Sequence, residues 1–292
     1  MDKKDWIRFW ALGVVWGTSF LWIKIAVNEV SPFVLVSLRT IFGTLGLALI
    51  LLFYRQARPT KEMARKALAP FLVIALFNVA VPFSLISWAE KYINSGIASI
   101  LNSATPLFSI ILAPLMIKDD PFTWRKLTGL LVGFVGVAIL ISPDLGQKLN
   151  NNLLGQGAML LATLSYAGAT VYARKTSQGL PAQFQSFMQV GLAALMMSVF
   201  TLVVERPVRL PALPITWFAL VWLGLLGSCI AYLLFFTLLH NIGPTRTTTV
   251  TYTLPLFGVI LGAVFLGEQS YIQSLIGGAL IISGVLLVNL GK

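Results

Sequence analysis

Hydrophobic and polar positions along this chain form a coarse pattern, in which long apolar runs alternate with short polar stretches. A helix needs about 20 mainly apolar residues to cross a bilayer. Ten runs approach or exceed that length, and little of the chain remains between them. The pattern predicts an all-α integral membrane protein with ten transmembrane helices, at residues 7–27, 32–54, 67–89, 94–117, 123–142, 153–173, 181–204, 214–239, 244–267 and 271–290.

The run at residues 94–118 returns 149 residues later, at residues 243–267, and each copy carries a Pro-Leu-Phe tripeptide. A proline inside a helix removes a backbone hydrogen bond, and lipid does not tolerate the freed carbonyl unless neighbouring helices or a wet cavity satisfy it. Interruptions at matching positions in two repeats point to a transporter's substrate site. Pro106 and Pro255 are therefore predicted helix kinks with a role in gating.

The repeat extends over nearly the whole chain and divides it into residues 1–145 and 150–292. Tyr166 corresponds to Trp16 at an offset of 150, and Pro181 corresponds to Pro32. Each half holds five predicted helices, so the second half must enter the membrane from the opposite side. The sequence thus predicts two inverted five-helix repeats, an arrangement that supports alternating access.

Composition and charge settle the class of protein and its expected orientation. The chain is 57% hydrophobic and 11% charged, and its net charge is +11. Fifteen of its 21 Lys and Arg residues fall in loops and termini that share the side of the N-terminus, and four fall in the opposite loops. The positive-inside rule then puts both termini and the loop at residues 55–66 in the cytoplasm. The basic charge is a topology signal, so no nucleic-acid partner is expected.

Several motifs lie at characteristic places along the chain: Trp16-Gly17, Arg39, Pro106-Leu-Phe, Pro255-Leu-Phe, Leu266-Gly267-Glu268 and the spaced glycines of the last helix. Taken together, these motifs resemble the EamA family of the drug/metabolite transporter superfamily. The resemblance spans the whole chain and implies a ten-helix bundle with a central cavity, which moves small metabolites, often amino acids or drugs, out across the bacterial inner membrane. The first half departs from the family pattern at residues 117–120, where Ile-Lys-Asp-Asp replaces the Leu-Gly-Glu of the second half.

Candidate substrate-binding residues are small polar and aromatic side chains on the predicted helices. A buried carboxamide such as that of Asn102 brings donors and acceptors that must all be satisfied, which favours a place beside a cavity. Aromatic rings offer stacking or cation-binding faces. Ordinary helix packing is the alternative for each of them. The candidates are Trp16, Phe20, Asn78, Ser99, Asn102, Tyr166, Tyr232, Thr248, Thr251 and Tyr252.

Arg39 lies seven residues into the second predicted helix, about 10 Å from its end. A charge at such depth needs a partner. Glu29, Glu90 and Glu268 are the carboxylates that fall on the same side of the membrane. Two roles stay open, a structural brace and a group that binds an anion or takes part in gating.

The sequence argues against enzymes and cofactors. The one histidine, His240, and the one cysteine, Cys229, form no metal-ligand motif, and no phosphate-binding glycine loop is present. Titratable groups at depth are nearly absent, so proton antiport through a mid-membrane carboxylate is not expected. Flow or exchange down the substrate's own gradient is expected instead, with Glu90, Glu268 and His240 as the near-surface groups that could carry protons.

The first hypothesis is therefore a secondary transporter that exports small organic metabolites, with apolar or aromatic amino acids favoured. Efflux of cationic drugs through the same fold is the main alternative, ahead of nucleotide-sugar transport. A membrane-embedded enzyme and a scaffolding protein fit the sequence poorly. The expected partners are a small-molecule substrate and the lipid bilayer, with the chain acting as a monomer or homodimer.

Overall fold

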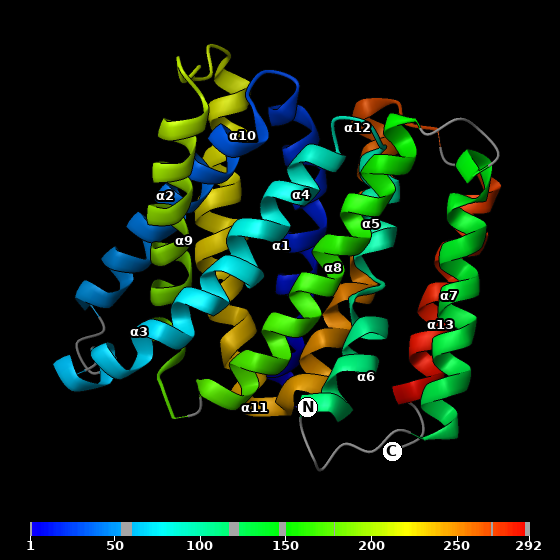
Figure 1. The fold of residues 1–292 in the computed structure, drawn as a ribbon, viewed down its shortest axis with the longest axis horizontal. Coiled ribbons are helices and arrows are strands. Elements are labelled where there is room, and N and C mark those ends of the chain that lie inside the picture. Colours follow the sequence, from blue (N-terminus) through cyan, green and yellow to red (C-terminus); the bar gives the residue numbers. More distant parts are fainter. Residues whose placement is uncertain are drawn as a thin grey trace.

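The computed structural model describes residues 2–53, 60–116, 123–145, 150–177, 179–269 and 271–289. Every regular element in these ranges is helical (Figure 1). In chain order the elements are α1 (Lys3–Val27), α2 (Pro32–Phe53), α3 (Lys61–Ala75), the π-helical η2 (Leu76–Ala80), α4 (Val81–Ala89), α5 (Ser95–Asn102), α6 (Thr105–Met116), α7 (Trp124–Leu145), α8 (Asn151–Thr176), α9 (Ala182–Val204), α10 (Pro214–Gly224), the π-helical η3 (Leu225–Ile230), α11 (Ala231–Thr248), the 3-10 helix η4 (Thr249–Thr253), α12 (Leu254–Leu266) and α13 (Ile272–Asn289).

The described part of the chain contains seven helices that are long and apolar enough to cross a membrane. Two shorter apolar helices, Val250–Leu266 and Ile272–Gly284, lie near the C-terminus. The helical architecture and these spans confirm a multi-pass membrane protein. Ten crossings remain a prediction. The seven spans are Lys3–Val27, Pro32–Phe53, Glu62–Ala89, Ser95–Leu112, Trp124–Pro143, Ala182–Val204 and Pro214–Ile242.

Two of the long helical segments contain a π-helical stretch. η2 lies between α3 and α4, and η3 lies between α10 and α11. They begin at Leu76 and Leu225, which are 149 residues apart, the same offset as the sequence repeat. A π-helical stretch shifts backbone carbonyls out of the regular α-helical pattern, and such stretches are frequent at functional sites. The two halves therefore share a backbone irregularity that the sequence pattern did not predict.

The segments that carry Pro106 and Pro255 are interrupted, and the structure differs here from the expected kinks. α5 ends at Asn102, and α6 begins at Thr105 with Pro106 as its second residue. Pro255 is likewise the second residue of α12, directly after the 3-10 helix η4. Proline costs little in the first turn of a helix, because that N–H has no intrahelical partner. The prolines therefore start new helices.

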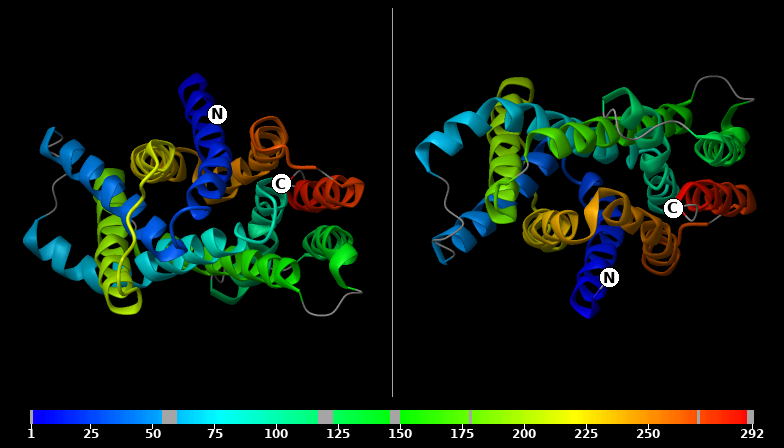
Figure 2. Two further views of the ribbon diagram at one scale, coloured as in Figure 1. Left: turned by 90° about the horizontal axis from the view of Figure 1, so that it is seen from above. Right: turned by 90° about the horizontal axis from the view of Figure 1, so that it is seen from below.

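Helices that correspond in the two halves pack against each other in antiparallel pairs. α7 lies beside α13, and the pair stands at one end of the elongated bundle, while α2 and α9 pack together toward the other end (Figure 2). A Cβ added at Gly136 would meet Gly277 O, and a Cβ added at Gly284 would meet Gly129 O. Small residues at such positions let the backbones of membrane helices approach closely.

The ends of the helices gather at two faces of the bundle. α1 begins and α13 ends near the lower face in Figure 1, where the labels N and C stand. The upper face collects the connections from α1 to α2, from α4 to α5 and from α9 to α10. Which face is cytoplasmic stays a prediction. Residues 55–59 of the predicted loop at 55–66 lie outside the described part of the chain, as do residues 117–120.

Candidate functional site

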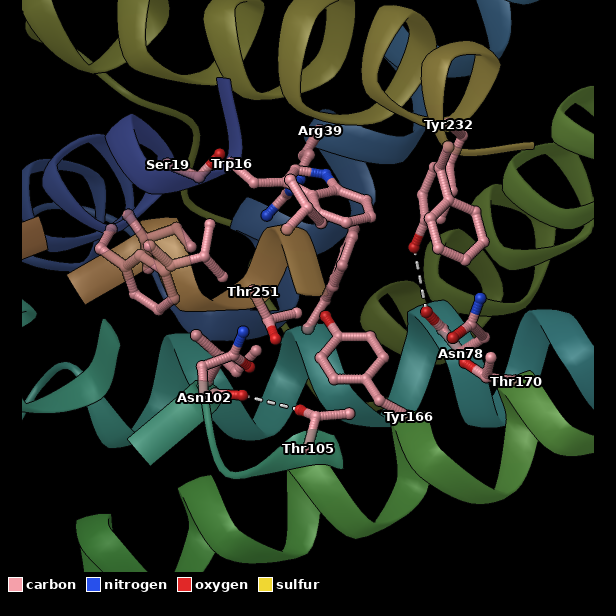
Figure 3. Close-up of a pocket in the computed structure, with 17 residues that line it drawn as sticks. Trp16, Ser19, Arg39, Asn78, Asn102, Thr105, Tyr166, Thr170, Tyr232 and Thr251 are labelled. Carbon is pink, nitrogen blue, oxygen red and sulfur yellow. Dashed lines mark hydrogen bonds between the residues drawn. The ribbon is translucent and has the colours of Figure 1, made fainter. Parts of the chain in front are cut away.

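A cavity of about 100 Å³ lies inside the bundle, where the irregular segments of the two halves come together. Figure 3 shows side chains reaching into this space from α1, α2, α8 and α11 on facing sides. Its lining joins residues that are far apart in the sequence. They are Trp16, Ser19, Phe20, Ile23, Arg39, Asn78, Phe83, Ile86, Asn102, Thr105, Tyr166, Thr170, Tyr232, Phe235, Val250, Thr251 and Leu254.

Most of the candidate substrate-binding residues, and Arg39, border this cavity. Among the candidates whose side chains are described, two do not. Ser99 is fully buried, donates its hydroxyl proton to Gly96 O (2.7 Å) and packs against Gly258. Tyr252 packs against the hydrophobic core, and the side chain of Thr248 lies outside the described part. Those that line the cavity are Trp16, Phe20, Asn78, Asn102, Tyr166, Tyr232, Thr251 and Arg39.

Several lining residues were missed from the sequence. They lie one helical turn from residues that were identified: on α1 Ser19 follows Trp16 and Ile23 follows Phe20, and on α11 Phe235 follows Tyr232. Residues three, four or seven apart share one face of a helix. A search one helical turn before and after each candidate, on the same helix face, would have found these positions. Phe83 and Ile86 could not be found in this way, because Asn78, the candidate on the predicted helix at 67–89, is five and eight residues away from them, farther than one helical turn.

The two π-helical stretches are tied to the cavity by reciprocal hydrogen bonds between the halves. The Tyr232 hydroxyl, from the second half, donates to Asn78 O of η2 (3.1 Å). The Trp16 indole, from the first half, donates to Gly227 O of η3 (3.3 Å). Asn78 and Gly227 are 149 residues apart and so occupy equivalent positions. A backbone carbonyl freed inside a membrane must find such a donor, so these aromatic side chains stabilise the irregular backbone while their rings face the cavity.

Arg39 is buried, with 3% of its surface exposed, and it contacts η3 and α4. Its Nε donates to Ser228 Oγ (3.0 Å), its Nη2 approaches Gly227 O at 3.5 Å, and its guanidinium lies 3.8 Å from the centre of the Phe83 ring. Cation–π attraction is strongest where water is excluded, as it is here. The buried cation is thus held by neutral acceptors and an aromatic face.

The expected pairing of Arg39 with a carboxylate is wrong, because the described partners of its guanidinium are Ser228, Gly227 and the Phe83 ring. Glu29 and Glu268 are engaged elsewhere. Glu29 accepts the N–H groups of residues 212 and 213 at the start of α10. Glu268 accepts from Ser95 N (2.9 Å), Ser95 Oγ (2.8 Å) and Gly96 N (3.2 Å), and so caps α5. Each carboxylate satisfies a helix N-terminus, where negative charge is favoured.

Asn102 contributes an unsatisfied polar atom to the cavity. The residue is 8% exposed, and its Oδ1 has no hydrogen-bond partner within the described part of the chain. Its backbone carbonyl accepts from the Thr105 hydroxyl (2.7 Å; Figure 3). A buried acceptor without a donor costs about 1–3 kcal/mol. The Asn102 side chain is therefore ready to accept a hydrogen bond from a bound molecule.

The chemistry of this lining suits recognition of a small organic molecule. The described residues hold no group of three or more His, Cys, Asp or Glu side chains that could bind a metal ion. What the cavity does offer is one guanidinium, one free amide oxygen, hydroxyl groups and the rings of Trp16, Tyr166 and Tyr232. Apolar pockets with a few convergent polar groups are typical of small-molecule sites.

The EamA-like transporter family matches residues 6–142 and, a second time, residues 153–290. This chain belongs to that family. The EamA resemblance seen in the sequence motifs is confirmed, and the chain is a membrane transporter.

Two EamA-type relatives span almost the whole chain. One is the uncharacterized inner membrane transporter YedA of Escherichia coli, 28% identical over 286 residues, which cover 97% of this chain and 89% of YedA. The other is the uncharacterized transporter YvbV of Bacillus subtilis, 25% identical over 280 residues, which cover 95% of this chain and 89% of YvbV. A solved crystal structure matches with a TM-score of 0.69 at 18% identity, covering 99% of this chain and 98% of the other, and supports the fold alone.

Proposed function

We propose that this EamA-family protein is a secondary transporter that exports small organic metabolites through its central cavity, and that its substrates are amino acids, including apolar and aromatic ones. The observation that carries the proposal is the cavity, which is lined by residues of η2, of the break between α5 and α6 and of η4, and is joined to η3 through the Trp16 hydrogen bond. Broken helices around an enclosed site are the usual setting for substrate binding in transporters built from repeats.

The polar groups of the cavity match the two ends of an amino acid. The Arg39 guanidinium suits a carboxylate, and Asn102 Oδ1 suits an ammonium group or another donor. The rings of Trp16, Tyr166 and Tyr232 give a surface for an apolar or aromatic side chain. Because Arg39 is the charged residue of this lining, a cationic drug would meet a like charge, which makes cationic efflux the weaker proposal.

The transport cycle that we propose rests on two inverted repeats, residues 1–145 and 150–292, with ten crossings and both termini in the cytoplasm of a bacterial cell. Antiparallel packing of α7 with α13 and the equivalent π-helical stretches support it. Rocking of the halves about the cavity would exchange its two openings. Pro106 and Pro255 begin the helices that move at the breaks, so their proposed role in gating is retained. The protein would act as a monomer or homodimer.

The decisive experiment is counterflow in liposomes that hold the purified protein. Vesicles preloaded with unlabelled L-phenylalanine should take up labelled L-phenylalanine faster than vesicles without protein, and unlabelled L-leucine should compete. Exchange of ethidium with no exchange of either amino acid would favour cationic efflux. Failure of all these probes to move would contradict the proposed substrate class.

A further inference from the structure

Glu90 is a carboxylate inside the protein that no part of the proposed substrate site uses. It follows the last residue of α4 and is fully buried, with 0% of its surface exposed. Neither of its carboxylate oxygens has a hydrogen-bond partner within the described part of the chain. An ionised carboxylate is very costly to bury without a partner, so this setting favours the protonated form of the group.

The position of Glu90 connects it to the cavity. Phe83 and Ile86 line the cavity from α4, and Glu90 follows at seven and four residues from them, on the same helix face. One turn of helix rises about 5.4 Å. Glu90 therefore lies roughly one turn from the cavity lining, at the end of α4 that leads into the connection to α5, which Figure 1 shows at the upper face of the bundle.

Lys24 holds this part of the chain in place. From α1, its ammonium donates to Glu90 O (2.5 Å) and to Ile93 O (2.9 Å), the backbone carbonyls of the turn between α4 and α5. The ammonium thus closes the turn against α1 and leaves the Glu90 carboxyl without an ion pair in this conformation. If the turn moved away from α1, both groups would meet water together.

The charged groups around Glu90 oppose one another. Lys24 from α1 and Arg39 from α2 favour its ionised form, whereas Glu268, after α12, disfavours it. α8, which also packs against α4, carries Arg174 and Lys175 only in its last turn, at its far end. Burial favours the proton-bound form and the two cations favour its release. Because these effects oppose one another, a change in the access of water to Glu90 can decide whether its carboxyl group keeps the proton.

We propose that Glu90 is a proton-binding site of the transporter, which holds its proton while the turn between α4 and α5 is closed and releases it when that end of the bundle opens. The carboxylic acid then gives its proton to water on that side and becomes a carboxylate beside Lys24. After the turn has closed and the opposite end of the bundle has opened, it takes a proton from that opposite side through the cavity, so that one proton crosses the membrane in each cycle. Substrate movement through the cavity would thereby be linked to proton movement. The link rests on the proposed transport function, whereas the proton site itself does not.

The proton site is tested by infrared titration of the purified protein in lipid. A carbonyl band from a protonated carboxyl group should be present at neutral pH. It should be lost in Glu90→Gln, shifted but retained in Glu90→Asp, and unchanged in Glu62→Gln, which removes an exposed carboxylate of α3. A band that survives in Glu90→Gln, or its absence from the parent protein, would overturn the proposal.

The link to transport is tested in liposomes that contain a pH-sensitive dye. An imposed gradient of L-phenylalanine should change the internal pH when the parent protein or Glu62→Gln is present, and this change should be lost in Glu90→Gln. An equal pH change in Glu90→Gln would overturn the link. If the parent protein exchanges no amino acid at all, the proposed function fails, and the infrared titration alone decides whether Glu90 is a proton site.

Discussion

The unsatisfied amide oxygen of Asn102 gives the cavity a hydrogen-bond acceptor that a bound molecule can use. The neighbouring polar side chains Asn78 and Ser228 have protein partners: Asn78 Nδ2 donates to Gln189 Oε1 (2.9 Å), and Ser228 Oγ accepts from Arg39. Partners of this kind fix the shape of the lining. Asn102 Oδ1 differs because its capacity to accept is unused, and a ligand that brings a donor there gains a hydrogen bond without breaking one.

Replacing this amide should weaken substrate binding more than it weakens the fold. In Asn102→Leu we expect the substrate concentration for half-maximal exchange to rise by up to about tenfold. That change corresponds to the binding free energy of one neutral hydrogen bond. Thr251→Val should lower exchange as well, because Thr251 faces the same space (Figure 3). Exchange measured in liposomes checks both, with Asn152→Leu, at an exposed position of α8, as the matched control. Unchanged exchange in Asn102→Leu and Thr251→Val would remove these residues from the site.

At the scale of whole elements, glycines control how closely the helices pack. A side chain at Gly136 or Gly284 would run into the backbone of the facing helix, whereas a Cβ at Gly157 of α8 would meet nothing within 4 Å. Association of helices in lipid depends on such close contact, because lipid tails are as apolar as the side chains themselves. The contact of α7 with α13 is therefore sensitive to a single methyl group.

Gly136→Ala should destabilise the protein by about 1–3 kcal/mol, the usual cost of overpacking. Gly157→Ala should be neutral or stabilising by up to about 1 kcal/mol, because alanine favours a helix over glycine. Thermal unfolding in detergent checks the pair. Equal melting temperatures for the two variants would show that the α7–α13 contact is looser than the structure indicates.

A second element-scale contact joins the turn after α1 to the start of α10. The Thr216 side chain, followed by the N–H groups of Leu213 and Ala212, holds the pKa of the Glu29 carboxyl below its ordinary value. A carboxyl whose pKa is lowered by folding stabilises the folded state above its unfolded pKa, and loses this effect as the pH falls through the folded value.

Glu29→Gln should therefore lower the melting temperature at neutral pH, and the difference from the parent protein should shrink once the pH falls below about 4, the ordinary range of a carboxyl. Melting curves at neutral and acidic pH measure this, with Glu62→Gln as an exposed control. A difference that stays constant across the range would mean that the Glu29 charge does not stabilise this contact.

At the scale of the whole molecule, the two halves complete each other's irregular segments. Tyr232 satisfies Asn78 O of the first half, and Trp16 satisfies Gly227 O of the second. Neither half can be distorted at its π-helical stretch without affecting the other. This reciprocity suits a transporter that moves between two related conformations, since contacts made by one half have counterparts in the other.

Orientation in the membrane is the prediction that belongs to this scale. In the parent protein the one cysteine, Cys229, is buried and should not react. An impermeant thiol reagent applied to intact cells should label Arg209→Cys and should label Thr60→Cys only after the cells are opened. The positive-inside distribution of Lys and Arg is the physical reason. Labelling of Thr60→Cys from outside, with Arg209→Cys protected, would invert the topology.

The sequence by itself determined the class of protein, the family and much of the cavity. Apolar runs of spanning length and a repeat of 149 residues can be recognised along the chain itself, without knowing which helices pack against one another. Asn102, Trp16 and Tyr232 were identified because each has a polar group inside a membrane helix, and burying a polar group is costly unless it finds a hydrogen-bond partner. The family match and the lining of the cavity agree with these inferences.

Only the tertiary structure decided which groups meet. Arg39 contacts Phe83 and Ser228 instead of a carboxylate, and Ser99 packs against Gly258. The Glu90 carboxyl group is buried without a hydrogen-bond partner among the described residues. Helical periodicity says which face of a helix is apolar, but it does not say which helix covers that face. The partner of a buried polar group comes from a distant part of the chain, and packing alone brings the two together.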